Sequence, residues 1–369
     1  MFKSTELKKV HIEISNRCQA SCPMCPRNIH SGLENPMLKE NDWSYNDFVT
    51  IFPQEILTNL ATITFCGTFG DPMLNNDLID MCRYVKDTAP HTDIRIHTNG
   101  SARPEAWWQR LAQSLPAKHQ VVFALDGLED TQSLYRIGTD FNKIIKNAKA
   151  FIDAGGYATW MFIRFKHNEH QVEQAETLAK QIGFKEFTLK NTRRFDNKEF
   201  SVLDREGKVS HVLEQPSDNV IRFVNRKDIE NYASWPNADS INCFALNTNE
   251  VYIDAHYTVL PCCIIGAFLY TNYNDSMFVK YGLYDENTSM NSMGRHIQQE
   301  VFDIVEELGG FESIDSRKKG LANILDSDLW QTIWQEKWEQ KTSTTCIVMC
   351  SQDTPYITLQ EQRTVQKKL

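Results

Sequence analysis

The sequence predicts an α/β protein, in which a partial barrel of parallel strands precedes a smaller α+β region. Over the first ~190 residues, short β-rich runs alternate with helix-like stretches at roughly 30-residue intervals, which is typical of βαβ units and a parallel sheet. The alternation stops near residue 196, and a cysteine-rich segment with a hairpin-like run begins near residue 241. This change predicts two structural parts joined by a connector.

Six strands are predicted in the first part. The β-rich runs are residues 10–15, 61–67, 92–98, 120–127, 159–165 and 186–190. The helix-like stretches between them are residues 43–59, 76–87, 104–115, 141–155 and 169–183. Gly183 closes the last stretch, as glycine often does at a helix end. Six units are too few for an eight-unit barrel, so we predict a TIM-like partial (βα)6 barrel, with functional loops at the carboxyl ends of its strands.

Domain boundaries are placed where the pattern changes. The predicted parts are the barrel at 1–195, the connector at 196–240, and the smaller C-terminal domain with its tail at 241–369. The later elements that we expect are a connector hairpin around Glu206-Gly207, a second hairpin at 249–263, a tryptophan-bearing helix at 326–340 and a solvated tail at 360–369.

The composition predicts a soluble globular protein. The chain is 41% hydrophobic and 24% charged, and no apolar run approaches the ~20 residues that a membrane crossing needs. A net charge of -9 argues against a nucleic-acid backbone as the main partner. The first residues lack the apolar region of a secretory signal, so the ten cysteines indicate the reducing cytoplasm, where thiols serve as metal ligands.

Three of these cysteines, Cys18, Cys22 and Cys25, share one loop directly after the first strand. Thiolates bind zinc and iron, and closely spaced thiolates allow one loop to wrap an ion or a cluster. A structural zinc ion would need a fourth ligand, for which His30 is a candidate. The alternative is a four-iron cluster with one iron left unligated by protein, and an open coordination position is typical of catalytic metal centres.

The spacing CxxxCxxC after an N-terminal strand resembles the signature of the radical S-adenosylmethionine (SAM) superfamily. The resemblance implies that Cys18, Cys22 and Cys25 bind a 4Fe–4S cluster whose open iron is chelated by SAM. One electron from the reduced cluster then cleaves SAM to methionine and a 5′-deoxyadenosyl radical, which abstracts hydrogen from a substrate. The resemblance also implies that Met24 lies against the adenine, although a methionine packed into the core is an equal alternative.

Two further loops extend the resemblance. GTFGDP resembles the family's GGE motif, which implies that Gly67, Gly70 and Asp71 bind the amino group of SAM, with Asp71 in place of the usual Glu. HTNGS resembles a TNG element of the family through Thr98 and Asn99. Without the cysteines, both loops would read as ordinary turns.

The fourth and fifth strands end in similar signals. ALDGLEDTQSLYRIG resembles a family stretch that implies ribose binding by Asp126 and carboxylate binding by Arg136, and a surface salt bridge is the alternative for Arg136. Ala124 stands where relatives usually carry Ser. In RFKHNEH, Arg164 and Asn168 are the implied SAM contacts.

A second set of cysteines lies towards the end of the chain. Cys243 and Cys262 flank the predicted hairpin, and Cys346 and Cys350 fit one helical turn or a tight loop. Four thiolates from two segments suit zinc or a fully ligated iron–sulfur cluster. The pattern resembles the twitch domain, the shortened form of SPASM, which implies one auxiliary 4Fe–4S cluster. Cys263 is then spare, and an exchange of roles with Cys262 stays open.

The resemblance implies a radical SAM enzyme. Peptide or protein modification is the favoured reaction, because many enzymes with this domain act on peptides. A dehydrogenase or cyclase acting on a small molecule or nucleotide is the alternative. A reducing partner such as flavodoxin or ferredoxin is implied. A non-catalytic iron–sulfur or zinc protein would explain the cysteines but not the ordered loops, and the sequence singles out no catalytic acid or base.

Overall fold

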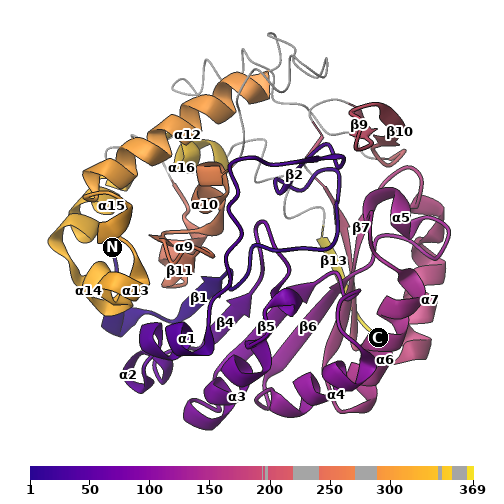
Figure 1. Cartoon of the computed structure of the whole chain (residues 1–369), viewed down its shortest axis with the longest axis horizontal. Helices are drawn as coiled ribbons and strands as arrows, with labels where there is room; N and C mark the ends of the chain where they lie inside the picture. The colour runs from indigo at the N-terminus through magenta and orange to yellow at the C-terminus, as the bar shows by residue number, and fades with distance from the viewer. Residues whose placement is uncertain (193, 196–197, 219–240, 271–288, 340–342, 351–363) are drawn as a thin grey trace.

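The computed structural model describes residues 1–192, 194–195, 198–218, 241–270, 289–339, 343–350 and 364–369. In this part of the chain the central feature is a sheet of nine strands in the order β12-β11-β1-β4-β5-β6-β7-β8-β13 (Figure 1). These strands are β1 Lys9–Ile12, β4 Thr62–Phe65, β5 Asp93–Thr98, β6 His119–Ala124, β7 Ala158–Arg164, β8 Glu186–Asn191, β11 Glu250–Ile253, β12 Val259–Leu260 and β13 Thr364–Lys368.

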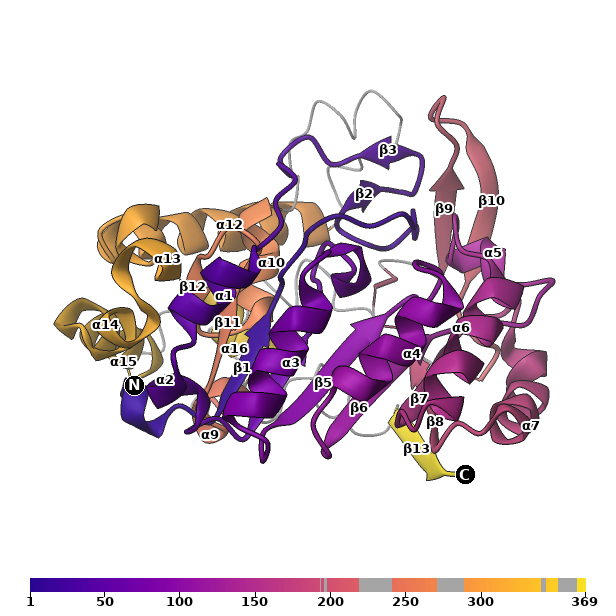
Figure 2. The same ribbon diagram turned by 60° about the horizontal axis from the view of Figure 1, so that its bottom comes forward.

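The six central strands confirm the predicted partial barrel. Strands β1, β4, β5, β6, β7 and β8 are neighbours in chain order, and each adjacent pair is parallel. Helices between them cover the outer face of the sheet (Figure 2). The helices of this part are α1 Tyr45–Ile51, α2 Gln54–Leu57, α3 Leu78–Thr88, α4 Glu105–Ser114, α5 Gln132–Tyr135, α6 Phe141–Asp153 and α7 Val172–Ile182. Single-turn 3-10 helices precede or follow them at η1 Ser4–Glu6, η2 Pro72–Leu74 and η3 Glu169–Gln171.

Local signals in the sequence explain where these helices begin and end. Ser44 and Asp47 form a capping box at the start of α1, and the Asp140 carboxylate accepts a hydrogen bond from the Lys143 amide at the start of α6. Helix α7 ends at Gly183, whose φ of 103° lies in the left-handed region. The predicted helix stop is therefore confirmed.

The two faces of the sheet differ in polarity. Val10 and Ile12 of β1 are buried against the helices, whereas His11 and Glu13 lie on the opposite, inner face. Because successive strand residues alternate between faces, the apolar core lies outside the barrel and polar groups gather inside it.

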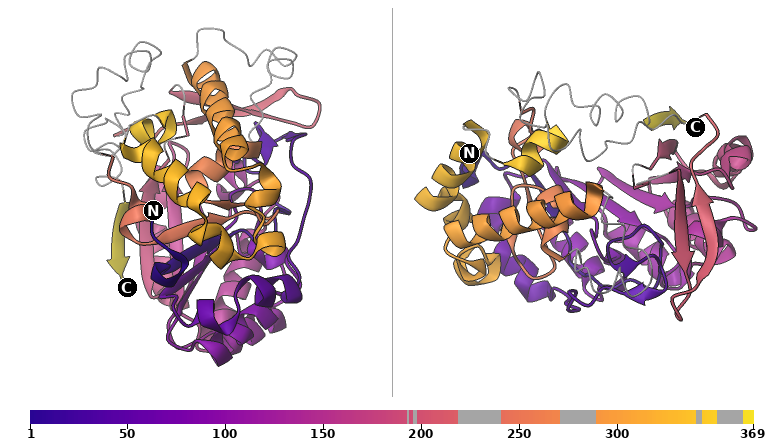
Figure 3. Two further views of the ribbon diagram at one scale, coloured as in Figure 1. Left: turned by 90° about the vertical axis from the view of Figure 1, so that its left-hand side faces the viewer. Right: turned by 90° about the horizontal axis from the view of Figure 1, so that it is seen from above.

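The C-terminal part of the chain extends the same sheet. Strand β11 lies parallel to β1, with Lys9 opposite Glu250, and β12 pairs antiparallel with β11, which confirms the predicted hairpin. Helices α10 and α12 pack together beside these strands (Figures 1 and 3). The remaining elements are α9 Phe244–Asn247, α10 Cys263–Tyr270, α12 Ser289–Glu307, η5 Phe311–Ser313, α13 Ser316–Lys319, α14 Leu321–Asp326, α15 Asp328–Glu339 and α16 Thr344–Cys350. Helix α15 is the predicted tryptophan-bearing helix, and its Trp330 and Trp334 side chains are fully buried.

The predicted tail is solvated, because residues 365–368 are exposed, but it is not free, and residues 360–363 lie outside the described residues. Residues Thr364–Lys368 form β13, which pairs antiparallel with β8. The reason is that β8 would otherwise be an edge strand with unpaired backbone groups, and an extended tail satisfies them.

Smaller hairpins stand apart from the main sheet. The connector forms β9 Glu199–Leu203 and β10 Val209–Glu214, with Gly207 in their turn as predicted, and the cysteine loop leads into β2 Asn28–Ile29 and β3 Leu33–Glu34. Figure 2 shows both hairpins projecting from the same side of the sheet. The predicted connector residues 219–240 lie outside the described residues. No helix in the described ranges combines the length and apolarity of a membrane span.

Candidate active site

The loop after β1 brings its three cysteines together. The Cys25 amide donates a hydrogen bond to the Cys22 carbonyl at 3.0 Å, and the Ser21 amide donates to the Ile137 carbonyl at 2.8 Å, so the loop is turned tightly and anchored. Burial raises the pKa of the Cys18 thiol, and Asp71 and the other two cysteines raise it further. The three sulfurs therefore face a common space.

Two nitrogen donors point at these sulfurs. Asn99 Nδ2 lies 3.6 Å from Cys18 Sγ, and Arg136 Nη1 lies 3.8 Å from Cys22 Sγ. Burial raises the pKa of the Cys22 thiol, and the positive charge of Arg136 opposes this effect. Arg136 is itself held by Asp126, with Nε 2.5 Å from Oδ2. The salt bridge expected as the alternative for Arg136 is therefore present, but it is not at the surface, because Asp126 is buried and Arg136 is partly buried.

This donor set fits an iron–sulfur cluster better than one metal ion. Among the described residues, no three Cys, His, Asp or Glu side chains are grouped tightly enough to hold a single ion. A four-iron cluster spaces its thiolates around a cube, and N–H donors to the sulfurs are typical of such sites. His30, the alternative zinc ligand, stacks on Phe200, and its Nδ1 lies 2.7 Å from the Ser201 carbonyl oxygen. Its ring is thus engaged by the β9 strand.

The loops at 67–72 and 98–100 are joined by Asp71. Its Oδ1 accepts hydrogen bonds from the Met73 amide and the Thr98 hydroxyl, and its Oδ2 accepts them from the amide and the side chain of Asn99, at distances of 2.6–3.0 Å. A carboxylate has about four acceptor positions. Asp71 is therefore placed as a clamp between two loops, and its contact with an amino group stays a prediction.

Glu13 is a site residue that our sequence analysis missed. Its Oε1 accepts hydrogen bonds from the amides of Phe69 and Gly70 at 2.7 and 2.8 Å, and its Oε2 accepts one from the Tyr252 hydroxyl at 2.8 Å. Burial raises the pKa of Glu13 to about 7, although these hydrogen bonds act in the opposite direction. A glutamate on the inner face, at the carboxyl end of a predicted strand, was the available signal.

The loops after β6 and β7 are also tied to each other. Asp126 Oδ1 accepts a hydrogen bond from the Ile163 amide at 2.6 Å, and Asn168 Nδ2 donates to the Asp126 carbonyl at 2.8 Å. Arg164 contacts Asn191 and Asp218. These side chains are therefore already engaged within the protein, and their predicted contacts with SAM remain untested.

Met24 lies at the edge of a small apolar cluster. Its side chain is buried and clusters with Tyr135, Phe165, Phe195 and Val202. This placement agrees with the packing alternative for Met24, and the adenine contact stays a prediction.

A comparison with known protein families matches the segment of the chain that carries this site. Residues 12–180, which run from the end of β1 into α7, match the family model described as the radical SAM superfamily. The protein is a radical SAM enzyme. Enzymes of this superfamily use a 4Fe–4S cluster and SAM. The matched segment contains the cysteine loop and the loops after β4, β5, β6 and β7.

Solved structures of radical SAM enzymes resemble this chain at low identity. Streptococcus suis SuiB bound to S-adenosylmethionine has a TM-score of 0.49 and 16% identity, over 78% of this chain and 68% of that one. BtrN in complex with AdoMet and 2-DOIA has a TM-score of 0.45 and 13% identity, over 95% and 97%. The anSMEcpe structure with bound AdoMet has a TM-score of 0.46 and 15% identity, over 92% and 94%.

The four later cysteines of this radical SAM enzyme also gather. Cys243 directly precedes α9, Cys262 lies between β12 and α10, and Cys346 and Cys350 lie on α16. The thiols of Cys346 and Cys243 add to the effect of burial in raising the pKa of Cys350 to about 12, and both also act on Cys262. The four thiols thus come from three separate segments and influence one another electrostatically, although among the described residues no three of them are grouped closely enough to hold a single metal ion.

Cys263 has different charged neighbours from Cys262. Burial raises its pKa to about 11, and the charged groups that add to this effect are Glu250 and Glu13 rather than the α16 cysteines. Cys66, at the end of β4, has Cys263 as its strongest charged neighbour. These interactions favour Cys262 as the member of the four-cysteine group, and the choice between Cys262 and Cys263 stays a prediction.

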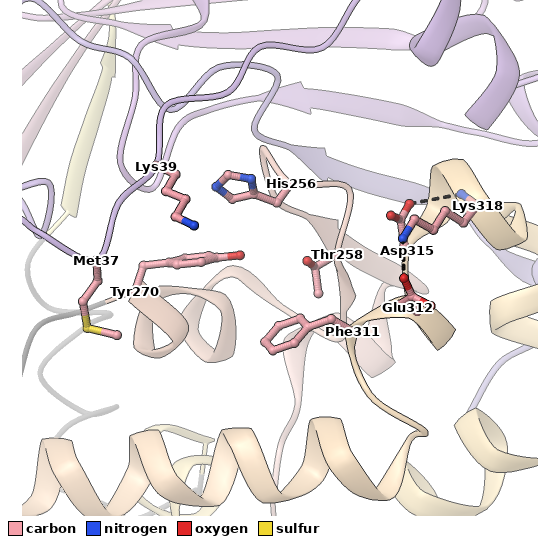
Figure 4. A pocket seen from close by; sticks show the side chains of 9 residues that line it. All are labelled: Met37, Lys39, His256, Thr258, Tyr270, Phe311, Glu312, Asp315 and Lys318. Carbon is pink, nitrogen blue, oxygen red and sulfur yellow. Dashed lines mark hydrogen bonds and ion pairs between the residues drawn. The ribbon is translucent and has the colours of Figure 1, made fainter.

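A pocket of about 360 Å³ lies where the loop after β3 meets the C-terminal part (Figure 4). Its lining residues are Met37, Lys39, His256, Thr258, Tyr270, Phe311, Glu312, Asp315 and Lys318. The Tyr270 ring packs edge-on against Phe69, with centroids 5.7 Å apart. The pocket therefore borders the back of loop 67–72, and its lining includes none of the predicted cluster or SAM ligands.

Replacing Gly70 by alanine is expected to displace loop 67–72. A Cβ at Gly70 would lie 2.0 Å from the Ser15 carbonyl oxygen and 2.6 Å from the Asn16 Cα, both in the segment that leads into the cysteine loop. We expect Gly70→Ala to lower stability by about 1–3 kcal/mol and to weaken SAM binding by the reconstituted enzyme. Gly155→Ala is the control: a Cβ there meets nothing within 4 Å but strains a φ of 91°, so this variant should lose stability without displacing loop 67–72. Unchanged SAM affinity in Gly70→Ala would contradict the placement of this loop.

The raised pKa of Glu13 predicts a pH-dependent stability. Its pKa is about 7 in the folded protein and lower in the unfolded chain, so between these values only the unfolded state releases the proton. The stability contributed by protonated Glu13 is therefore lost as pH rises from about 4.5 to about 7, and the loss is complete above that range. Glu13→Gln carries no titratable proton, so its Tm should rise relative to that of the wild type between pH 4.5 and pH 7, and the difference should stay constant at higher pH. Parallel Tm curves for the two proteins over this range would show that folding does not raise the pKa of Glu13.

Proposed function

We propose that Cys18, Cys22 and Cys25 hold the 4Fe–4S cluster and that SAM binds beside it, at the carboxyl ends of the barrel strands. When bound, the cluster and SAM supply a carbon radical that removes a hydrogen atom from the substrate. The observation that carries the proposal is the convergence of three thiols with two nitrogen donors at their sulfurs.

The surrounding residues orient the site. Arg136 places a positive charge beside Cys22 and is fixed by Asp126, so it stabilises the thiolate form that a metal requires. Asp71 and Glu13 hold loop 67–72 from its two sides. We place the amino group of SAM against this loop, where Gly67 and Gly70 allow close approach to the backbone.

We also propose one auxiliary 4Fe–4S cluster, ligated by Cys243, Cys262, Cys346 and Cys350. Its support is the gathering of these thiols from three segments, and four thiolates fully ligate such a cluster. Such a centre transfers electrons, here to or from the substrate. A zinc ion is the alternative occupant, and iron analysis distinguishes the two.

The proposed substrate is a peptide or protein, and the proposed reductant is a flavodoxin or ferredoxin. SuiB has also been solved with precursor peptide SuiA, and BtrN with 2-DOIA, so the structures similar to this chain include both peptide and small-molecule complexes. The deciding experiment is deuterium transfer from labelled candidates into 5′-deoxyadenosine. Transfer from a small molecule and from no peptide would favour a small-molecule dehydrogenase or cyclase instead.

Replacing Cys22 by alanine is expected to abolish SAM cleavage, because the cluster then loses one of its three ligands. The measurement is 5′-deoxyadenosine formed from SAM and dithionite by anaerobically reconstituted protein. Cys82→Ala is the matched control, since Cys82 is a buried thiol of α3 whose pKa is affected by burial alone. Product formation by Cys22→Ala at the wild-type rate would refute the assignment.

Replacing Cys346 by alanine tests the auxiliary cluster. We expect the iron content to fall by about four per chain, while SAM cleavage stays measurable. Cys263→Ala should keep the wild-type iron content, because the charged groups that raise the pKa of Cys263 are Glu250 and Glu13 rather than the α16 cysteines. Equal iron in Cys346→Ala and wild type would remove the auxiliary cluster from the proposal, and iron loss in Cys263→Ala would exchange the roles of Cys262 and Cys263.

A further inference from the structure

Lys190 lies on the inner face of the barrel, at the carboxyl end of β8. Along this strand Phe187 faces outward and packs near Trp160, with ring centroids 6.2 Å apart. Residues two apart share a face, so Glu186, Thr188 and Lys190 point inward. Lys190 is the last of these inward residues and is therefore the one nearest to the loops of the site.

The two ends of this inner row differ in how their charges are satisfied. Glu186 accepts hydrogen bonds from Gln120 Nε2, the Tyr157 hydroxyl and Gln366 Nε2, at 2.6–2.9 Å. The Lys190 ammonium group is partly buried and has neither an ion pair nor a side-chain hydrogen bond among the described residues. Burial lowers the pKa of Lys190, and an unpaired cation in such a place costs free energy. Within the part of the chain that the structure describes, the carboxyl end of the barrel thus holds a cation without a partner.

The neighbours of Lys190 come from the far side of the barrel. Cys66 at the end of β4 and His97 on β5 both interact electrostatically with it, although β5 is three strands away in the sheet and β4 is four. Ile94 and Ile96 of β5 are buried in the outer core, so His97 points to the inner face of the sheet, as Lys190 does. Both side chains therefore line the interior of the barrel. Cys66 also interacts with Asp71 and Glu13 of the loops around the site.

Among the described residues, no carboxylate pairs with Lys190. Glu13 accepts its hydrogen bonds from loop 67–72 and from Tyr252, and Asp71 accepts hydrogen bonds from the loop at 98–100. Burial and the Lys190 charge lower the pKa of His97 to about 4, so its ring is neutral near pH 7. His97 makes no side-chain hydrogen bond to any other described residue, and a neutral imidazole offers one N–H donor. One ammonium group and one N–H donor together match an oxyanion.

We propose that Lys190, with His97 beside it, binds a carboxylate or phosphate group of the substrate on the inner face of the barrel. The inference rests on the proposed function, because it takes the substrate to occupy the space next to SAM. It adds that the substrate presents an anionic group at the carboxyl end of β8.

The test titrates acetate and inorganic phosphate into the reconstituted holoenzyme with SAM, by isothermal titration calorimetry. We expect Lys190→Met to weaken anion binding about tenfold or more, the loss of one hydrogen bond to a charged group, and Lys190→Arg to restore part of it. Lys185→Met is the matched control, since Lys185 is exposed at the opposite end of β8. The anion that binds more tightly indicates whether the substrate group is a carboxylate or a phosphate.

Two outcomes would overturn the proposal. One is equal anion binding by the wild type and Lys190→Met, or no anion binding by either. The other is a rise of about tenfold in the KM for SAM in Lys190→Met alone, since Lys190 would then serve the carboxylate of SAM. Failure of the wild type to form 5′-deoxyadenosine would instead reject the proposed function, and the anion titration would still decide the role of Lys190.

Discussion

Buried carboxylates hold the loops of this enzyme in place. Glu13 accepts hydrogen bonds from the loop after β4 and Asp71 from the loop after β5, while Asp126 accepts them from Ile163 of β7 and from Arg136 in the segment after β6. A buried carboxylate without donors would cost several kcal/mol, so each acid restricts the loop that satisfies it. The cysteine loop and its surroundings are consequently ordered by the protein itself, and ligands for the cluster are brought together by a network that continues from strand to strand.

The same network connects the two groups of cysteines. Tyr252 of β11 donates to Glu13, and Glu13 accepts from the loop that contains Gly70. Strand β11 belongs to the C-terminal part but lies parallel to β1 in the barrel sheet. Because one sheet carries both parts, the four later thiols have a defined position relative to the first three. The proposed auxiliary cluster would therefore be held by the same sheet as the cysteine loop after β1.

The inner face of the barrel carries a negative charge at the amino end of β8 and a positive charge at its carboxyl end. Glu186 is satisfied by a polar network at the amino end, whereas Lys190 and His97 at the carboxyl end have no such partners. Burying the Lys190 ammonium group without a partner among the described residues costs free energy of folding. An anionic group of the substrate, bound to Lys190 as we propose, would offset this cost.

The sequence by itself determined the six strand–helix units, the grouping of the cysteines, both hairpins and the loops at the strand ends, because local periodicity and turn residues encode these features. Tertiary structure alone decided that residues 364–368 pair with β8, that Asp71 clamps Asn99, and that Glu13 supports loop 67–72. It also decided that Cys262 and Cys263, although adjacent in the chain, have different charged neighbours. These contacts join residues far apart in the chain, and the curvature of the sheet that brings them together leaves no local signal.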